Sequence, residues 1–344
     1  MTRALELAAH GRATTHPNPR VGCVIVRDGA VVGEGWHARA GEPHAEIHAL
    51  RAAGERARGA EVFVSLEPCR HHGRTPPCVA ALIAAGVGKV WVAMTDPNPR
   101  VAGQGIECLR AAGIDVEAGL LRPEAEALNR GFVSRMTRGR PWVTLKLAAS
   151  LDGRTAMASG ESRWITGPEA RADVHRLRAE AGAVLTGVGT VLADDPQLSC
   201  RLGPESRDSG DVRQPDRIVL DAEARVPETA KVWADGARRF WFTAEPGRVP
   251  DGVTRIVSPH AEGGLALDAV LAELARHDVN EVLAECGPRL AGALLMSGLV
   301  DELVLYLAPA LLGPEARPLA HLPGLEHLAQ RLQLRWGDAR RIGD

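Results

Sequence analysis

Short apolar stretches of strand length alternate with segments whose apolar residues recur at helical spacing through the first third of the chain. An Asp28-Gly29 pair between two such stretches predicts a tight hairpin. The pattern predicts strands at residues 22–26, 30–34, 61–65, 89–94 and 115–118, and helices at residues 4–10 and 104–112 and at the segments that begin at His44 and Cys78. Strands that alternate with helices predict an open sheet covered by helices, and therefore an α/β fold.

A helix over residues 123–136 leads the chain into a Gly- and Pro-containing segment, residues 137–141. The chain, at 344 residues, is long enough for two cores, so we place two domains at residues 1–140 and 141–344. The alternation then restarts, with strands at residues 142–147, 183–185, 217–220, 239–242, 281–284 and 302–307, and helices at residues 168–179, 267–276 and 289–296. Residues 203–216 are polar and predict a surface loop.

One histidine, one glutamate and two cysteines stand in the order that a zinc-dependent deaminase requires. One imidazole and two thiolates hold Zn²⁺ and leave one position open, while a glutamate two residues past the histidine moves protons. We therefore expect His44, Cys69 and Cys78 to be the metal ligands and Glu46 to be the catalytic proton shuttle. Residues 259–262 repeat Pro-His-Ala-Glu, but no Pro-Cys follows within reach, so we interpret this second copy as coincidence.

Eight residues separate the two cysteines, where the common deaminase signature has two. His71 and His72 lie in this insert and offer alternative ligands, although a loop role is favoured because three ligands already suffice. Cys78 stands at the start of a predicted helix, where the helix dipole stabilises a thiolate.

The run from residue 66 to residue 78, Leu-Glu-Pro-Cys-x-His-x-Gly-Arg-Thr-Pro-Pro-Cys, resembles the deaminase half of the bifunctional riboflavin-biosynthesis deaminase/reductase family, as does Asn-Pro-Arg-Val-Gly-Cys at residues 18–23. The resemblance implies a cytidine-deaminase-like α/β/α domain. Its implied reaction removes the 2-amino group of a diamino-pyrimidinone that carries a phosphoribosylamino chain. It also places Asn18 at the substrate.

Two glycine-containing turns mark the second half, at residues 187–190 and 285–292. A turn that feeds a helix exposes backbone N–H groups to an anion, although such glycines also serve simply as tight turns. Residues 146–153, 162–166 and 190–196 resemble the reductase half of the same family, which implies a dihydrofolate-reductase-like α/β domain that uses NADPH to reduce the ribosyl group to ribityl.

The resemblance also implies positions for ligand contacts. Near the cofactor it places Ala148, Trp164, Thr190, Asp194, Gly287, Pro288, Arg289, Leu290, Ala291, Gly292 and Ala293. Near the substrate it places Ser162, Arg178, Leu198, Arg201 and Glu285.

Lys146 is one of three lysines against 38 arginines and lies in an otherwise apolar strand. Its ammonium could protonate an oxygen as the ribose ring opens, whereas a lysine at a strand end can also be structural. Arg178 and Arg201 are suited to the substrate phosphate, or to a solvated face. Which of Asp194, Asp195 and Glu285 moves a proton stays open.

NADPH requires a contact to the 2′-phosphate, and we look for it in the loop after the strand at residues 217–220. Asp221 and Glu223 argue for the unphosphorylated cofactor there, and Arg225 argues for NADPH.

Composition narrows the partners. A net charge of −2 favours neither nucleic acid nor a membrane surface, and no apolar run approaches the roughly 20 residues of a membrane span. Six scattered cysteines without a secretion signal indicate a reduced, cytoplasmic protein. The resemblance implies a homo-oligomer formed through the reductase domain. Members of the family continue past a segment like residues 341–344 into one more strand.

Two other functions are compatible with the motifs. The first is a zinc deaminase of another nucleobase or of tRNA, although a polynucleotide substrate is disfavoured by the neutral charge. The second is a zinc nucleobase deaminase whose C-terminal domain is a non-catalytic ligand-sensing or dimerisation module.

Overall fold

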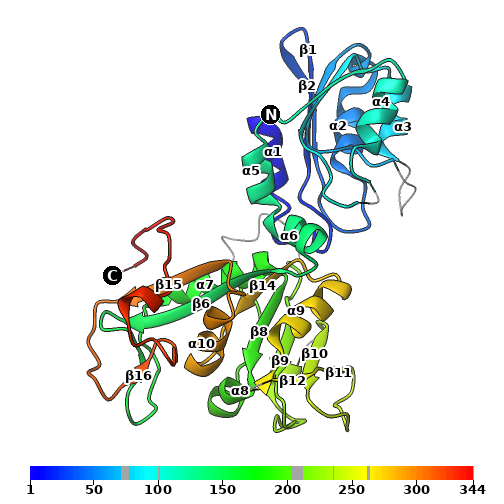
Figure 1. Ribbon diagram of the computed structural model, residues 1–344. Helices are drawn as coiled ribbons and strands as arrows, with labels where there is room; N and C mark the ends of the chain where they lie inside the picture. The colour runs from blue at the N-terminus through cyan, green and yellow to red at the C-terminus, as the bar shows by residue number, and fades with distance from the viewer. Residues whose placement is uncertain (71–76, 100, 203–211, 235, 262–263, 344) are drawn as a thin grey trace. The chain divides into compact units, whose positions relative to one another are not determined.

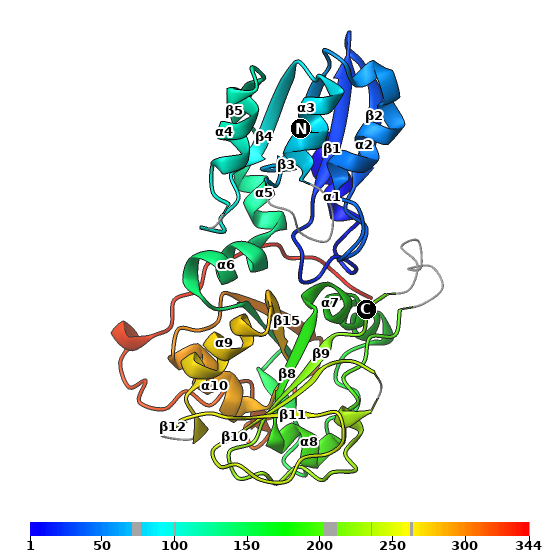
Figure 2. The same ribbon diagram turned by 90° about the vertical axis from the view of Figure 1, so that its right-hand side faces the viewer.

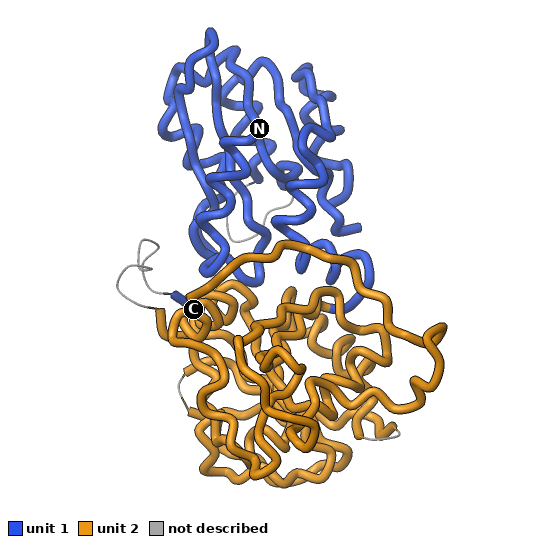
Figure 3. The backbone as a smooth tube through the Cα atoms, turned by 90° about the vertical axis from the view of Figure 1, so that its left-hand side faces the viewer, with its two compact units in different colours: residues 1–140, 209–212 blue, residues 141–208, 213–344 orange. Residues whose placement is uncertain are grey.

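The computed structural model describes the chain apart from residues 71–76, 100, 203–211, 235, 262–263 and 344. The alternative ligands His71 and His72, and most of the expected loop at residues 203–216, therefore lie outside the described residues. The chain divides into two compact units, one made of residues 1–140 with the short segment 209–212 and the other made of the rest of the chain from Pro141 on (Figure 3). No helix among the described residues is long and apolar enough to cross a membrane.

The first unit is built on a five-stranded sheet that contains every strand expected there. In spatial order the strands are β2 (Ala30–Trp36), β1 (Gly22–Arg27), β3 (Glu61–Leu66), β4 (Lys89–Met94) and β5 (Asp115–Ala118). β1 is antiparallel to β2 and to β3, whereas β3, β4 and β5 are parallel. Parallel β3 and β4 bring their carboxyl ends to one edge, where the motif around Cys69 begins.

Helices cover both faces of this sheet, as Figures 1 and 2 show. They are α1 (Thr2–Ala9), α2 (Ala45–Ala53), the 3₁₀ helix η1 (Gly54–Ala57), α3 (Cys78–Ala85) and α4 (Gln104–Ala111). On β1, Cys23 and Ile25 pack in the core with α2, α3 and α4, whereas Val24 packs with α1. The alternation of β1 side chains thus separates two cores and gives the three-layer α/β/α arrangement.

The single helix expected at residues 123–136 is instead two helices, α5 (Arg122–Leu128) and α6 (Arg130–Arg138). Asn129 breaks the run because its buried side chain pairs with the backbone of Arg20, accepting the N–H at 2.8 Å and donating to the carbonyl at 2.9 Å. A side-chain amide that satisfies both groups of a distant backbone position outweighs local helix propensity.

The second unit is built on a seven-stranded sheet in which every adjacent pair is parallel. In spatial order its strands are β11 (Thr254–Val257), β10 (Arg239–Thr243), β9 (Asp216–Leu220), β8 (Ala183–Gly187), β14 (Glu281–Ala284), β6 (Trp142–Ser150) and β15 (Glu302–Ala308). The sequence pattern missed the edge strand β11, whose four residues are at most half-buried. Two short ribbons pair β7 (Arg154–Ala156) with β16 (Arg317–Pro318), and β12 (His260–Ala261) with β13 (Gly264–Leu265).

Among the described residues of this unit the helices are α7 (Pro168–Ala181), α8 (Val188–Asp194), α9 (Leu267–Arg276) and α10 (Pro288–Met296), with short 3₁₀ helices η3 (Lys231–Trp233) and η4 (Leu328–Gln330). Leu145 and Leu147 of β6 pack in the core formed with α9 and α10. Ala148 faces the other way and packs with Val174 of α7 and with Tyr306. Lys146, which shares the face of Ala148, therefore lies beneath α7.

Candidate active sites

The three expected metal ligands converge in the first unit. His44 precedes the first turn of α2, Cys69 follows β3, and Cys78 opens α3. The Nδ1 atom of His44 lies 3.3 Å from the Cys78 sulfur and 3.5 Å from the Cys69 sulfur, and all three ligand atoms lie within 4.8 Å of one another. One imidazole and two thiols at this spacing form three corners of a tetrahedral zinc site with one open position.

The surroundings of Cys69 favour its thiolate. The hydrogen bond with the Cys78 thiol, together with those from the imidazole of His44 and the backbone N–H of Cys78, lowers the pKa of the Cys69 thiol. Since thiolates rather than thiols bind metals, the local structure prepares Cys69 as a ligand.

Glu46 lies in the first turn of α2 and is only 3% exposed. Its Oε2 atom has no hydrogen-bond partner among the described residues. Burial, with a smaller contribution from Cys69, raises the pKa of the Glu46 carboxyl to about 7. A buried carboxylate with an uncompensated oxygen beside three soft ligands fits a zinc deaminase, because such a group can take up and release a proton near neutral pH.

His37 is a neighbour of this site that sequence motifs did not reveal. Its buried ring packs edge-on against the ring of His44, with centroids 5.3 Å apart. Its Nε2 lies 3.0 Å from the amide nitrogen of Asn18, and its Nδ1 lies 3.2 Å from the carbonyl of Pro43. Burial lowers the pKa of His37, so a neutral ring can accept from Asn18 and donate to Pro43. Asn18 is thereby oriented near the metal ligands.

The second unit brings Lys146 of β6 and Glu285, which follows β14, beside Arg178 of α7. The Nε of Arg178 lies 2.5 Å and its Nη2 3.0 Å from the two oxygens of Glu285, and the Nζ of Lys146 lies 3.9 Å from the same carboxylate. Burial would raise the pKa of Glu285, but the adjacent Arg178, with help from Lys146, holds this pKa below its usual value. Burial lowers the pKa of Lys146. A buried lysine with a lowered pKa is suited to proton transfer.

Arg178, expected at the substrate, lines the cavity but is also bound to protein groups. Besides its paired contact with Glu285, its Nη1 donates to the carbonyl of Ser199 at 3.0 Å. Because all three guanidinium nitrogens bind protein groups, Arg178 fits the task of holding Glu285 and the chain near Ser199. Arg201 remains at the cavity wall, with its backbone N–H on the Nδ1 of His175 at 3.2 Å.

A cavity of about 2000 Å³ opens over these groups. It is lined by most of the residues expected to bind ligands: Lys146, Ala148, Ser162, Trp164, Arg178, Thr190, Asp194, Leu198, Arg201, Glu285, Gly287, Pro288, Arg289, Leu290 and Ala293. Ala291 and Gly292, also expected near the cofactor, do not line it. They are buried on the inner face of α10, where a Cβ on Gly292 would lie 1.9 Å from the carbonyl oxygen of His321. Helical periodicity turns these two positions toward the protein interior.

The two glycine turns meet because β8 and β14 are neighbours in the sheet. Gly187 caps α8 and Gly287 caps α10, and a Cβ on Gly287 would lie 3.9 Å from the hydroxyl oxygen of Thr190. The N-terminal N–H groups of α10 therefore begin at the cavity wall, at the carboxyl ends of parallel strands, which suits the pyrophosphate of a dinucleotide.

Comparisons with known proteins match a protein family to each of the two units. Residues 141–344 match the family described as RibD C-terminal domain, and residues 1–94 match the cytidine and deoxycytidylate deaminase zinc-binding region. The chain is 55% identical over 351 residues to riboflavin biosynthesis protein RibD of Escherichia coli (strain K12), covering 100% of this chain and 96% of that protein. The chain belongs to the RibD family.

Solved structures show the same relationship to RibD. An Acinetobacter baumannii RibD structure has a TM-score of 0.93 at 46% identity, covering 99% of this chain and 94% of that one. A Thermotoga maritima deaminase/reductase has a TM-score of 0.85 at 34% identity, covering 98% and 95%. As a RibD-family protein, the chain is a bifunctional enzyme of riboflavin biosynthesis, with a zinc-dependent deaminase and an NADPH-using reductase. The alternative of a non-catalytic C-terminal domain is thereby excluded.

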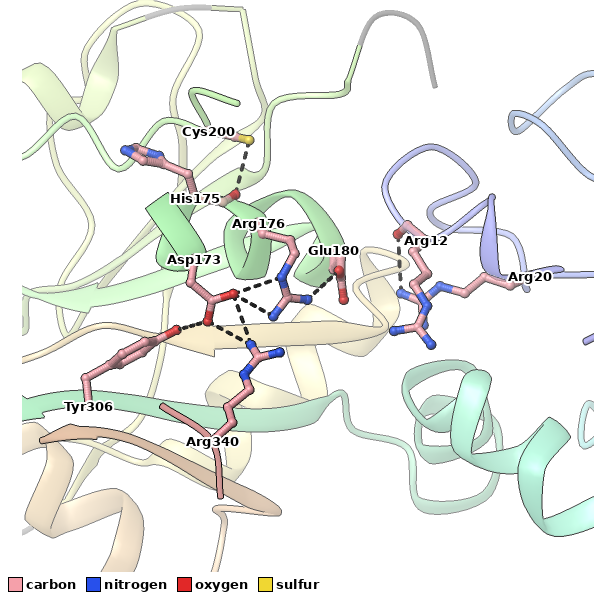
Figure 4. A network of polar contacts seen from close by, with 9 residues as sticks. All are labelled: Arg12, Arg20, Asp173, His175, Arg176, Glu180, Cys200, Tyr306 and Arg340. Carbon is pink, nitrogen blue, oxygen red and sulfur yellow. Dashed lines mark hydrogen bonds and ion pairs between the residues drawn. The ribbon is translucent and has the colours of Figure 1, made fainter. Parts of the chain in front are cut away.

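Tyr306 is a second residue that motifs did not reveal in this RibD-family chain. Its hydroxyl donates to Asp173 at 2.6 Å, and Arg176 and Arg340 bind the same carboxylate at 2.9 and 3.1 Å, as Figure 4 shows. The Nζ of Lys146 lies 5.7 Å from the centre of the Tyr306 ring. The chain's single tyrosine thus packs near Lys146 while Asp173 holds its hydroxyl in place.

The side chain of Asp221, which was expected to favour the unphosphorylated cofactor, is buried and cannot play that part. It is 1% exposed, and its Oδ2 accepts the backbone N–H of Val226 at 2.8 Å and the indole N–H of Trp241 at 3.3 Å. Because Asp221 is turned into the protein, it is unavailable to a ribose hydroxyl. Glu223 and Arg225 line the cavity and lie 3.3 Å apart.

Proposed function

We propose that the deaminase site, within residues 1–140, hydrolyses the 2-amino group of 2,5-diamino-6-(5-phosphoribosylamino)pyrimidin-4-one. The reductase site, within residues 141–344, then reduces the ribosyl chain of the product to ribityl. The name of the Thermotoga maritima neighbour describes a diaminohydroxyphosphoribosylaminopyrimidine deaminase and 5-amino-6-(5-phosphoribosylamino)uracil reductase. The observation that carries the proposal is the presence, in one chain, of a three-ligand cluster with a buried Glu46 and of a cavity with a buried Lys146–Glu285 pair.

In the deaminase, His44, Cys69 and Cys78 would hold Zn²⁺, which supplies a Lewis acid. Glu46 takes a proton from the attacking water as the new C–O bond forms. It then delivers a proton to the amino group, so that the C–N bond breaks and ammonia leaves. Burial raises the pKa of Glu46 to about 7, so the carboxyl can both accept and release a proton near neutral pH. Asn18, held by His37, orients the pyrimidine.

In the reductase, NADPH supplies a hydride for the anomeric carbon. Lys146 donates a proton from Nζ to the ring oxygen as the sugar C–O bond opens. Glu285 opposes the effect of burial on the pKa of Lys146 and so favours its charged form. Arg178 fixes Glu285, and Arg201 at the cavity wall offers its guanidinium to the substrate phosphate.

The cofactor would lie across the start of α10, near Thr190, Asp194, Ala148 and Trp164. Trp164 is 70% exposed, and the Arg171 guanidinium lies 4.4 Å from the centre of its ring. This cation–π contact covers one face of the ring. Because Asp221 is buried, Arg225 is the residue of the loop after β9 that can contact a 2′-phosphate.

We also propose that the protein is cytoplasmic and self-associates through its reductase unit. β15 is an edge strand of the seven-stranded sheet, and its Leu305 and Leu307 are exposed together with the nearby Leu311. Exposed apolar residues on a strand edge favour a partner surface. A concentration-independent monomer in sedimentation would refute this association.

Mass spectrometry of the diamino-pyrimidine phosphate incubated with enzyme tests the proposed reactions. We expect a mass change of deamination without NADPH, and further addition of two hydrogens with NADPH. Deamination alone would refute the assigned reductase substrate, and an unchanged substrate in both reactions would refute both assignments.

A further inference from the structure

Glu67 is a buried carboxylate that neither reaction uses. It directly follows β3 and is 3% exposed. Its Oε2 accepts the backbone N–H groups of Asp96 and Gly103, each at 3.0 Å, and its Oε1 accepts those of Gly105 at 2.8 Å and Ile106 at 3.3 Å. Four backbone donors occupy the four acceptor sites that an ionised carboxylate offers.

These donors come from the loop after β4 and from the first turn of α4. The first N–H groups of a helix have no partner inside the helix, and a carboxylate at this end also interacts favourably with the helix dipole. Glu67 therefore fixes the start of α4 and ties the preceding loop to it.

The start of α4 contacts Pro68 and Arg70, the residues on either side of the ligand Cys69. A Cβ placed on Gly105 would lie 2.1 Å from the carbonyl oxygen of Pro68, so backbone meets backbone there without room for a methyl group. On the other side of Cys69, the Nη1 of Arg70 donates to the side chain of Gln104 at 3.2 Å.

α3 contacts Cys69 directly. The backbone N–H of Val79 donates to the Cys69 carbonyl at 3.2 Å, and that of Cys78 donates to the Cys69 sulfur at 3.4 Å. Cys69 is thus bracketed by α3, which also carries the ligand Cys78, and by α4, which Glu67 fixes.

We propose that Glu67 is a positioning residue of the zinc site: by fixing α4, its carboxylate sets the place of Cys69 as a ligand. The proposal rests on zinc binding by Cys69 and goes beyond it. Without this contact the protein should still fold and bind zinc, but the ligand should be less constrained and the metal should leave faster. Partners that orient metal ligands typically contribute about 10- to 100-fold to metal affinity.

The test is the rate of zinc release from purified, zinc-loaded full-length protein to a chromogenic chelator. In Glu67→Gln the size is kept, but the amide nitrogen would face two backbone N–H groups whichever way it is turned. We expect release to be roughly tenfold or more faster than in the wild type, with reductase activity unchanged. Hydrogen exchange of the Gly105 and Ile106 amides should accelerate in the same variant.

Val24→Ala is the control, because Val24 is a buried residue of β1 that packs with α1, away from the core that contains α4, so its truncation lowers stability without a contact to Cys69 or α4. We expect its zinc release to stay within about twofold of the wild type. Equal release rates in Glu67→Gln and the wild type, or release from Val24→Ala as fast as from Glu67→Gln, would overturn the proposal.

Gly105→Ala gives a second test, which also serves if Glu67→Gln fails to fold. It keeps the carboxylate but presses a methyl group on the Pro68 carbonyl, so release should again accelerate. Wild-type release in this folded variant would overturn the proposal. Absence of zinc from the wild-type protein would instead refute the zinc assignment itself, and the proposal with it.

Discussion

Replacement of Glu285 by glutamine should move the pH dependence of the reductase. The Nζ of Lys146 lies 3.9 Å from the Glu285 carboxylate, and both side chains are largely buried. At this distance two unit charges interact by about 4 kcal/mol at an effective dielectric constant of about 20, which corresponds to about 3 pKa units as an upper bound. Arg178 stays beside Lys146 in the variant and opposes its protonation further.

The sign of the effect follows from the lysine. Burial already lowers the pKa of Lys146 below its ordinary value, and Glu285 counteracts that lowering. Without the carboxylate, Lys146 loses its proton at a lower pH. Because the protonated lysine is the proposed acid, the basic limb of kcat should move to lower pH by roughly 1 to 3 units.

The assay is steady-state reduction of the deaminated substrate with saturating NADPH at successive pH values. Glu180→Gln is the matched control, since Glu180 also pairs with an arginine of α7, Arg176 at 2.7 Å, but is absent from the cavity lining. We expect its basic limb to coincide with that of the wild type. A basic limb that is unchanged or moves to higher pH in a folded Glu285→Gln protein would refute the proposed role of the Lys146–Glu285 pair.

Four further outcomes are expected. Purified protein should hold about one zinc per chain, and a Cys69→Ala, Cys78→Ala double variant analysed by metal spectrometry should hold none; retained zinc would contradict the ligand assignment. Glu46→Gln should keep its zinc and lose deaminase kcat by on the order of a hundredfold or more, whereas loss of both would indicate a ligand role. The two sites should be independent, so Glu46→Gln should spare reduction and Lys146→Ala should spare deamination; loss of both activities in either stable variant speaks against this. Arg225→Ala should lower the NADPH-to-NADH ratio of kcat/KM, and an unchanged ratio would remove Arg225 from the 2′-phosphate site.

Local patterns carried much of the fold. The Asp28-Gly29 hairpin, the strands β4 and β5 and the helix α9 are present with the expected bounds or within two residues of them. Their hydrophobic periodicity matches the face that each element buries, so short-range information suffices. The sequence also named three candidate metal ligands by residue type and order, and the structure brings those three side chains together.

Local patterns failed where a distant group decides. Asn129 breaks a helix because of the backbone of Arg20, which no window of sequence around Asn129 contains. The edge strand β11 has no clear alternation, because its residues are at most half-buried and its pairing with β10 defines it.

The two sites show the same contrast between what local sequence patterns predict and what distant contacts decide. Sequence alone determined the α/β class, the order of zinc ligands and Glu46, and the residues of the two glycine turns. Only the tertiary structure decided that Arg178 is committed to Glu285, that Asp221 is turned inward, and that Glu67 holds the start of α4. A motif fixes the chemistry that a side chain can perform, but the partner it meets depends on strands and helices that bring together residues 20 to 107 positions apart.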